Sequence, residues 1–260
     1  MNFEIFQIDA FADAAFKGNP AAVVLLENWL EDRVLQNIAA ENNLSETAFI
    51  IEKKSTWAIR WFTPAREVDL CGHATLASAH VLFFERHIKQ EEIHFESRSG
   101  RLAARRNGEL ITLDFPTIAS KILDGDTSPS WIAALQPVEV LGSSQDLMVV
   151  MRSQRDVENF VVDPVIVSTL NCRGLIITSR GQNADFVSRC FYPELQVDED
   201  PVTGSAHCQL TPYWGAKLGK TKMVARQLSR RGGTIYCEMS RDRILLSGQS
   251  FKYLQGTITF

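Results

Sequence analysis

The chain contains one motif twice, and this internal repeat constrains the fold more than any other feature of the sequence. Residues 60–64 (Arg-Trp-Phe-Thr-Pro) recur at 189–193 (Arg-Cys-Phe-Tyr-Pro), an offset of 129 residues in a chain of 260. At this offset, residues 48–64 and 177–193 align without a gap, each with the pattern of strand, turn and strand. Because the offset is close to half of the chain, the repeat predicts two similar halves.

In both copies a glycine then opens a helix of small residues, at Gly72 and at Gly204. Glycine lets the backbone approach a ligand closely, and the first N–H groups of a helix carry partial positive charge. Each helix start can therefore bind an anion. Clefts between domains are favoured ligand sites, so we expect a carboxylate to bind between the two helix starts. Polar residues gather at these starts: Asp69, Cys71, His73 and Thr75 in the first half, and Asp198, Asp200, Thr203, Ser205 and His207 in the second.

The periodicity predicts many strands and few helices, so each half is mostly β around one apolar helix and the fold class is α+β. Helices are expected at 31–42 and after the two glycines, and Asn107-Gly108 predicts a hairpin. The polar, turn-rich stretch 120–130 predicts the boundary between an N-terminal half, 1–122, and a C-terminal half, 123–260. The last strand is expected to pack back on the first half.

Composition excludes several classes of protein. The hydrophobic fraction is 45%, 22% of residues are charged and the net charge is −4, as in soluble globular proteins that bind neither nucleic acid nor membranes through a global field. No apolar run reaches the roughly 18 residues of a membrane-spanning helix, and residues 1–9 have the pattern of an alternating strand rather than of a signal peptide. The five cysteines have neither disulfide nor zinc spacing, so we expect no metal, and reduced thiols in the cytoplasm.

Glu46 stands out because it lies between a predicted helix end and an apolar strand. A carboxylate shielded there would have a raised pKa, which suits proton transfer. The alternative is a surface or capping acid. At the offset of 129 its counterpart is Leu175, so the acid is present in one half only.

Other candidate residues have two interpretations each. His73 is a proton donor and acceptor or a helix-start packing residue. Asp200 orients a histidine, holds a substrate amine or complements the helix dipole, and Ser205 either binds substrate or simply begins the helix. Cys71 is a thiolate with a lowered pKa or a small apolar filler. Neither a nucleophile elbow of the form Gly-x-Ser-x-Gly nor a nucleotide-binding glycine loop occurs.

Together, several motifs resemble the PhzF-like phenazine biosynthesis isomerases, which have the diaminopimelate epimerase-like fold. The matching stretches are Asp9-Ala-Phe11, Phe16-Lys-Gly-Asn-Pro20, Asn43-Leu-Ser-Glu46-Thr47, Arg60 to Pro64, Leu70-Cys-Gly-His-Ala-Thr75 and Asp200-Pro-Val-Thr-Gly-Ser-Ala206. The resemblance implies two pseudo-symmetric halves, each a β-barrel-like sheet wrapped around a central helix, with the site between them.

The resemblance also implies a cofactor-independent isomerase that moves a proton within a small carboxylate-bearing metabolite, of the dihydro-hydroxyanthranilate type, and a possible homodimer. By this resemblance Glu46, His73 and Asp200 are catalytic. The substrate-binding residues are Gly72, Ala74, Gly204, Ser205 and Ala206. One departure matters: the related epimerases use one cysteine from each half, whereas this chain has Cys71 and no cysteine before the second helix. An epimerase or racemase that uses Cys71, and a non-catalytic protein that binds a small ligand or a partner, remain the alternatives.

Overall fold

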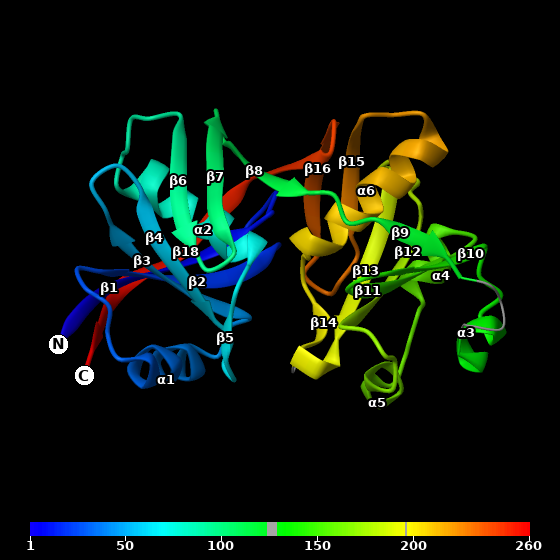
Figure 1. The fold of residues 1–260 in the computed structure, drawn as a ribbon, viewed down its shortest axis with the longest axis horizontal. Helices are drawn as coiled ribbons and strands as arrows, with labels where there is room; N and C mark the ends of the chain where they lie inside the picture. Colours follow the sequence, from blue (N-terminus) through cyan, green and yellow to red (C-terminus); the bar gives the residue numbers. More distant parts are fainter. Residues whose placement is uncertain (124–128, 196) are drawn as a thin grey trace. The chain divides into compact units, whose positions relative to one another are not determined.

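The structure, a computed structural model, describes residues 1–123, 129–195 and 197–260. The chain forms two compact units (Figure 1). The first combines Met1–Asp114 with Ser247–Phe260, and the second is Phe115–Leu246. Both units contain strands and helices, so the predicted α+β class is confirmed.

The first half of the chain supplies these elements: β1 (Asn2–Ala10), β2 (Asn19–Leu26), α1 (Asp32–Asn42), β3 (Glu46–Glu52), β4 (Trp57–Phe62), β5 (Glu67–Val68), α2 (Gly72–His80), the π-helical turn η1 (Val81–Glu85), β6 (Glu92–Ser97), β7 (Gly100–Asn107), β8 (Leu110–Pro116) and β9 (Ser120–Ile122). The second half supplies α3 (Ser130–Ala134), β10 (Glu139–Ser143), β11 (Asp146–Val150), α4 (Gln154–Glu158), α5 (Pro164–Ser168), β12 (Gly174–Arg180), β13 (Phe186–Tyr192), the 3₁₀ turn η3 (Pro193–Leu195), β14 (Val197–Asp200), α6 (Gly204–Leu218), β15 (Lys222–Gln227), β16 (Gly233–Ser240), β17 (Arg243–Gly248) and β18 (Ser250–Thr259).

The strands of the two halves pair in the same order, as the repeat predicts. In the first half β1–β2 is antiparallel, β2–β3 parallel, β3–β4 and β4–β5 antiparallel, and β4–β6 parallel. In the second half β10–β11, β11–β12, β12–β13, β13–β14 and β13–β15 follow the same sequence of directions. The two halves are therefore pseudo-symmetric copies of one strand plan.

The repeated arginine of each motif has the same role in both copies. Arg60 on β4 forms a two-pronged ion pair with Glu67 on β5, with Nε to Oε1 and Nη2 to Oε2 both at 2.7 Å, and stacks on Phe62. Arg189 on β13 pairs in the same way with Glu199 on β14, at 2.6 and 3.0 Å, and stacks on a phenylalanine two residues later. The repeat therefore preserves a planar guanidinium that ties a short edge strand to its neighbour.

The gapless alignment of the two hairpins was wrong by one residue. The β3–β4 register pairs Ala48 with Trp61, whereas the β12–β13 register pairs Ile176 with Cys190. The turn of the second hairpin, 181–185, is one residue longer than the first, 53–56, so the offset changes from 128 in the first strand to 129 in the second. The structural counterpart of Glu46 is consequently Gly174 and not Leu175.

The final strand of each half pairs with the first strand of the other half. β18 runs antiparallel to β1, and the two chain ends lie beside each other (Figure 1). β9, which follows the first half, runs antiparallel to β10. The predicted boundary between 122 and 123 lies after β9, inside the second unit, and residues 124–128 of the turn-rich stretch lie outside the described residues.

Helix α2 is buried along nearly its whole length, from His73 to His80, and packs against β1, β2, β3, β7 and β18. Small side chains allow this close packing of a helix within a sheet. Helix α6 runs to Leu218, and Gly219 after it adopts the left-handed conformation typical of a helix end. Its internal Pro212 cannot donate to the carbonyl of Cys208, and Ile118 N–H donates to that carbonyl instead, at 3.1 Å.

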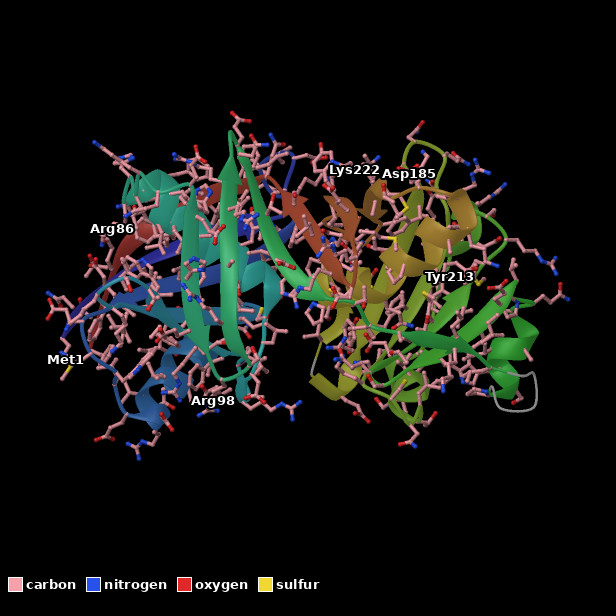
Figure 2. All side chains as sticks on the ribbon, turned by 45° about the horizontal axis from the view of Figure 1, so that its top comes forward. Met1, Arg86, Arg98, Asp185, Tyr213 and Lys222 are labelled. Atoms are coloured by element: carbon pink, nitrogen blue, oxygen red, sulfur yellow. The ribbon has the colours of Figure 1, made fainter. Side chains whose placement is uncertain are left out.

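Side chains cover the surface of each unit, among them Arg98 in the first and Tyr213 in the second (Figure 2). Arg98, on the turn between β6 and β7, forms an ion pair with Glu67 at 2.8 Å. Tyr213 on α6 donates its hydroxyl to Glu139 on β10 at 3.0 Å. All five cysteines are free thiols. Within the described ranges, no helix is long and apolar enough to cross a bilayer.

Candidate active site

The backbone of the first unit brings Glu46 and His73 together. Helix α1 ends at Asn43, which has a left-handed φ of 48°, and the chain then enters β3 at Glu46. The parallel pairing of β3 with β2 places Glu46 opposite Ala21. Because α2 begins at Gly72, His73 lies in its first turn, where an imidazole can reach the start of β3.

Glu46 and His73 form a close and largely buried ion pair. The Nε2 atom of His73 lies 3.0 Å from Oε2 of Glu46, and the exposed fractions of the two side chains are 6% and 18%. Neither of these two atoms has an aligned hydrogen bond within the described residues, so their contact depends on charge rather than on direction. The carboxylate therefore keeps hydrogen-bonding capacity for another group.

The pKa of His73 is raised well above its ordinary value of 6.5. Burial acts against the charged imidazolium, but the neighbouring Cys71 and Glu46 outweigh it. His73 is accordingly an imidazolium beside a carboxylate.

Cys71 is the residue immediately before α2, and its Sγ lies 3.6 Å from Nδ1 of His73. Burial, together with the negative charge of Glu46, raises the pKa of the Cys71 thiol to about 11. The possibility of a thiolate stabilised by the helix start is therefore not supported, because desolvation exceeds the effect of the helix dipole.

Asn19 is a residue of this site that the sequence interpretation missed. Its side chain is fully buried, and Nδ2 lies 3.2 Å from Nδ1 of His73. The residue belongs to Phe16-Lys-Gly-Asn-Pro20, a stretch that resembles the family but to which no site role was assigned. Its burial beside His73 is visible only in the structure, and a buried amide needs hydrogen-bond partners.

Donor atoms of Glu46, Cys71 and His73 lie within 4.8 Å of one another, a spacing that could suit a metal ion. However, the carboxylate contacts Nε2 of the imidazole, while the thiol contacts Nδ1. To bind a metal ion, the thiol, with its raised pKa, and the imidazolium of His73 would both have to lose a proton. In these protonation states the three residues do not hold a metal ion.

The second unit contains the other predicted site residues at the start of α6. Asp200 ends β14; its Oδ2 accepts from the hydroxyl of Thr203 at 2.5 Å, and its backbone carbonyl accepts from Gln227 Nε2 at 2.7 Å. Because the Thr203 hydroxyl is turned to Asp200, it does not cap the helix. The start of α6 therefore lacks a side-chain cap.

Gly204, Ser205 and Ala206 form the first turn of α6, and Ser205 is half-buried. Ala74, in the first turn of α2, and Ala206 are fully buried. Because an alanine side chain has no polar atom, these two residues can offer a ligand only backbone groups. The predicted residues thus form two clusters, one in each unit.

Two further histidines have packing roles. Burial lowers the pKa of both His80 and His207 to about 4. His80 Nδ1 lies 2.8 Å from the hydroxyl of Ser250, and His207 Nδ1 lies 2.8 Å from the carbonyl of Thr203. Both are neutral at pH 7 and are not proton carriers there.

The chain was compared with known proteins. A family model described as "Phenazine biosynthesis-like protein" matches residues 8–256. The chain belongs to this family. An uncharacterized isomerase of Pseudomonas aeruginosa is 45% identical over 258 residues, covering 99% of each chain. Phenazine biosynthesis-like domain-containing protein 2 of Mus musculus is 41% identical over 287 residues, covering all of both.

Solved structures show the same fold. A phenazine biosynthesis protein of the PhzF family from Enterococcus faecalis covers all of both chains, with 44% identity and a TM-score of 0.95. A hydroxyproline epimerase from Agrobacterium vitis is 8% identical, covers 99% of this chain and 92% of its own, and has a TM-score of 0.64. The latter shares the fold only. The predicted resemblance and the epimerase-like fold are therefore both confirmed.

Proposed function

We propose that this member of the phenazine biosynthesis-like family is a cofactor-independent isomerase that moves a proton within a small carboxylate-bearing metabolite. The observation that carries the proposal is the buried pair of Glu46 with His73, whose nearest atoms are 3.0 Å apart. Relatives named as isomerases support the reaction class. The substrate that we propose is of the trans-2,3-dihydro-3-hydroxyanthranilate type, and by the same resemblance we propose a cytoplasmic homodimer.

In this mechanism Glu46 removes a proton from one carbon and returns it to another. One group can do both steps if it alone touches the migrating proton and water is kept away. The neighbouring imidazolium of His73 compensates the carboxylate charge and fixes its position. The pair with His73 leaves lone pairs on the carboxylate, which can accept the substrate proton.

Residues of both units have proposed supporting roles. Asp200 assists as a second polar group, and backbone groups of Gly72, Ala74, Gly204 and Ala206 contact the substrate. For α6, the support is a helix start that the Thr203 side chain leaves uncapped.

A two-thiol epimerase mechanism is disfavoured by the second helix start. The structural counterparts of Cys71 and His73 are Thr203 and Ser205, and neither carries a thiol. Cys71 itself is buried and has a raised pKa. One acid/base group in one unit fits a proton shift on one face of a substrate better than an inversion that needs two.

The test is proton–deuterium exchange in D₂O followed by NMR, with trans-2,3-dihydro-3-hydroxyanthranilate and a panel of small carboxylates including amino acids. Wild type should exchange a ring-carbon proton, and Glu46→Gln should lower that rate at least about 10³-fold, since it removes the proton carrier. The matched control is Glu52→Gln at the exposed far end of the same strand, which should exchange like wild type. Exchange retained in Glu46→Gln, or exchange only at an amino-acid Cα, would overturn the proposal.

A further inference from the structure

The corrected register shows how the two units differ where the site is built. In the first unit Glu46 on β3 stands opposite Ala21 on β2. In the second unit Gly174 on β12 takes the place of Glu46, and Asp146 on β11 stands opposite it. The acidic residue has therefore moved to the other strand of the parallel pair.

Asp146 is a buried carboxylate whose charge is balanced by Arg173. Its side chain is 1% exposed, and it accepts two hydrogen bonds from Arg173, from Nε at 2.9 Å and from Nη2 at 2.5 Å. The guanidinium of Arg173 stacks on the ring of Tyr192, whose hydroxyl lies 3.4 Å from Asp146 Oδ2. Two-pronged pairing and stacking together hold the arginine in one orientation.

Arg173 then reaches the start of α6. Its Nη2 donates to the hydroxyl oxygen of Ser205 at 3.0 Å. A guanidinium has donors only, so Ser205 must accept this bond, and its own hydrogen is left to point to a different acceptor. Ser205 and His73 occupy the same place, the second residue of their helices. Where the first unit presents a titratable pair, the second presents a hydroxyl held by a cation that does not titrate.

We propose that Arg173, anchored by Asp146, is a positioning residue that holds Ser205 as a hydrogen-bond donor to the carboxylate of the substrate. This inference rests on the proposed function, because it assigns the carboxylate of that substrate to Ser205. The unit that carries Glu46 performs the proton transfer, and the Asp146–Arg173–Ser205 chain orients the molecule that reacts.

Equilibrium binding tests this role without turnover. The probes are 3-hydroxyanthranilate, an aromatic analogue with no ring proton to shift, and 2-aminophenol, the same ring without the carboxylate. Their dissociation constants are measured by calorimetry for wild type, Ser205→Ala, Arg173→Gln, Arg173→Lys and the Arg173→Gln/Ser205→Ala double variant. Arg189→Gln is the matched control, since Arg189 also forms a two-pronged ion pair in the second unit but contacts Glu199 instead.

We expect Ser205→Ala and Arg173→Gln each to weaken 3-hydroxyanthranilate binding about tenfold, the loss of one hydrogen bond to a charged group. The double variant should bind no more weakly than Ser205→Ala, Arg173→Lys should recover part of the loss, and 2-aminophenol should bind all variants alike. This pattern separates positioning from a general electrostatic effect of losing the Arg173 charge. A general electrostatic effect on binding would add to the loss caused by Ser205→Ala in the double variant.

Three results would overturn the role of Arg173. The first is additive losses in the double variant, and the second is unchanged binding of 3-hydroxyanthranilate by Arg173→Gln. The third is a wild type that binds the two probes equally well or binds neither of them. Arg173→Lys keeps a cation beside the buried Asp146, so it tests the role if Arg173→Gln does not fold. Failure of the proposed function is a separate result, since it is measured as exchange by Glu46→Gln.

Discussion

At the scale of single residues, the state of His73 depends on Glu46. We expect the imidazole of His73 to titrate well above pH 6.5 in the wild type, and its pKa to fall in Glu46→Gln, where burial is no longer opposed by the carboxylate. NMR titration of the imidazole resonances between pH 5 and 9, assigned with a His73→Asn variant, measures both values.

The same shift predicts how stability changes with pH. A raised folded-state pKa means that folding takes up a proton, so this contribution is complete below about pH 6.5 and is lost as pH rises through the folded pKa of His73. The free energy of unfolding of wild type relative to Glu46→Gln should therefore be largest near pH 6 and decline at higher pH. A wild-type His73 that titrates at or below pH 6.5 would contradict this account.

Sequence could predict Glu46 and His73 because each lies beside a boundary that has its own signal, a helix end or a helix-opening glycine. It could not predict Arg173, whose partner Asp146 is 27 residues away on another strand. Nothing in the local residues marks Arg173 as the partner of Asp146, since the parallel pairing of β11 with β12 brings the two together. Tertiary pairing, rather than a motif, creates that part of the candidate site.

At the scale of elements, Gly174 at the start of β12 is required by packing. A Cβ at this position would lie 2.1 Å from Tyr192 Cδ1 and 2.7 Å from the carbonyl oxygen of Phe191. The Tyr192 ring is 4% exposed and stacked on Arg173, so it cannot swing away freely. The space that the Glu46 side chain enters in the first unit is filled by an aromatic ring in the second.

We expect Gly174→Ala to lower the free energy of unfolding by about 3 kcal/mol, at the upper end of overpacking costs, because backbone must move as well as the ring. Urea denaturation measures it. The control is Gly219→Ala, where a new Cβ meets nothing within 4 Å but φ is +65°, so the cost should be only about 1 kcal/mol. If Gly174→Ala were as stable as wild type, Tyr192 would not be fixed as described.

Long elements followed from the sequence more reliably than short ones. Periodicity predicted α1, which buries the repeating apolar set Leu35, Ile38 and Ala39 on one face. The short strand β5 was missed because two residues carry no period, and Glu67 joins β4 through Arg60. The hairpin register was misplaced by one residue because turn length, rather than strand pattern, sets it.

At the scale of the whole molecule, neither contiguous half of the chain contains all the strands of its unit. The pairing of β1 with β18 extends from Asn2 opposite Thr259 to Ala10 opposite Ser250. Residues 1–122 therefore lack a complete neighbour for β1, and residues 123–260 lack β9, the partner of β10. The distant segment Ser247–Phe260 completes the first unit, and contacts between residues far apart in sequence slow folding.

The two ends of the chain are hydrogen-bonded to each other. Phe260 N–H donates to the carbonyl of Met1 at 3.2 Å, and the N-terminal amine donates to the carbonyl of Phe260. Because these ends touch, residues 247–260 can be joined by a short Gly-Ser linker to the front of residues 1–114 without displacing β18. This permuted unit contains both strands of the pair, whereas the fragment 1–122 leaves the backbone groups of β1 that pair with β18 without partners.

We expect the permuted unit to unfold cooperatively and to give dispersed amide resonances, and the fragment 1–122 to aggregate or remain unfolded at the same concentration. Circular dichroism melts and ¹H–¹⁵N spectra distinguish the two. A matched fusion with residues 247–260 in scrambled order controls for added length, and it should behave like 1–122. Cooperative folding of 1–122 alone would contradict this account, because it would show that the first unit is stable without β18.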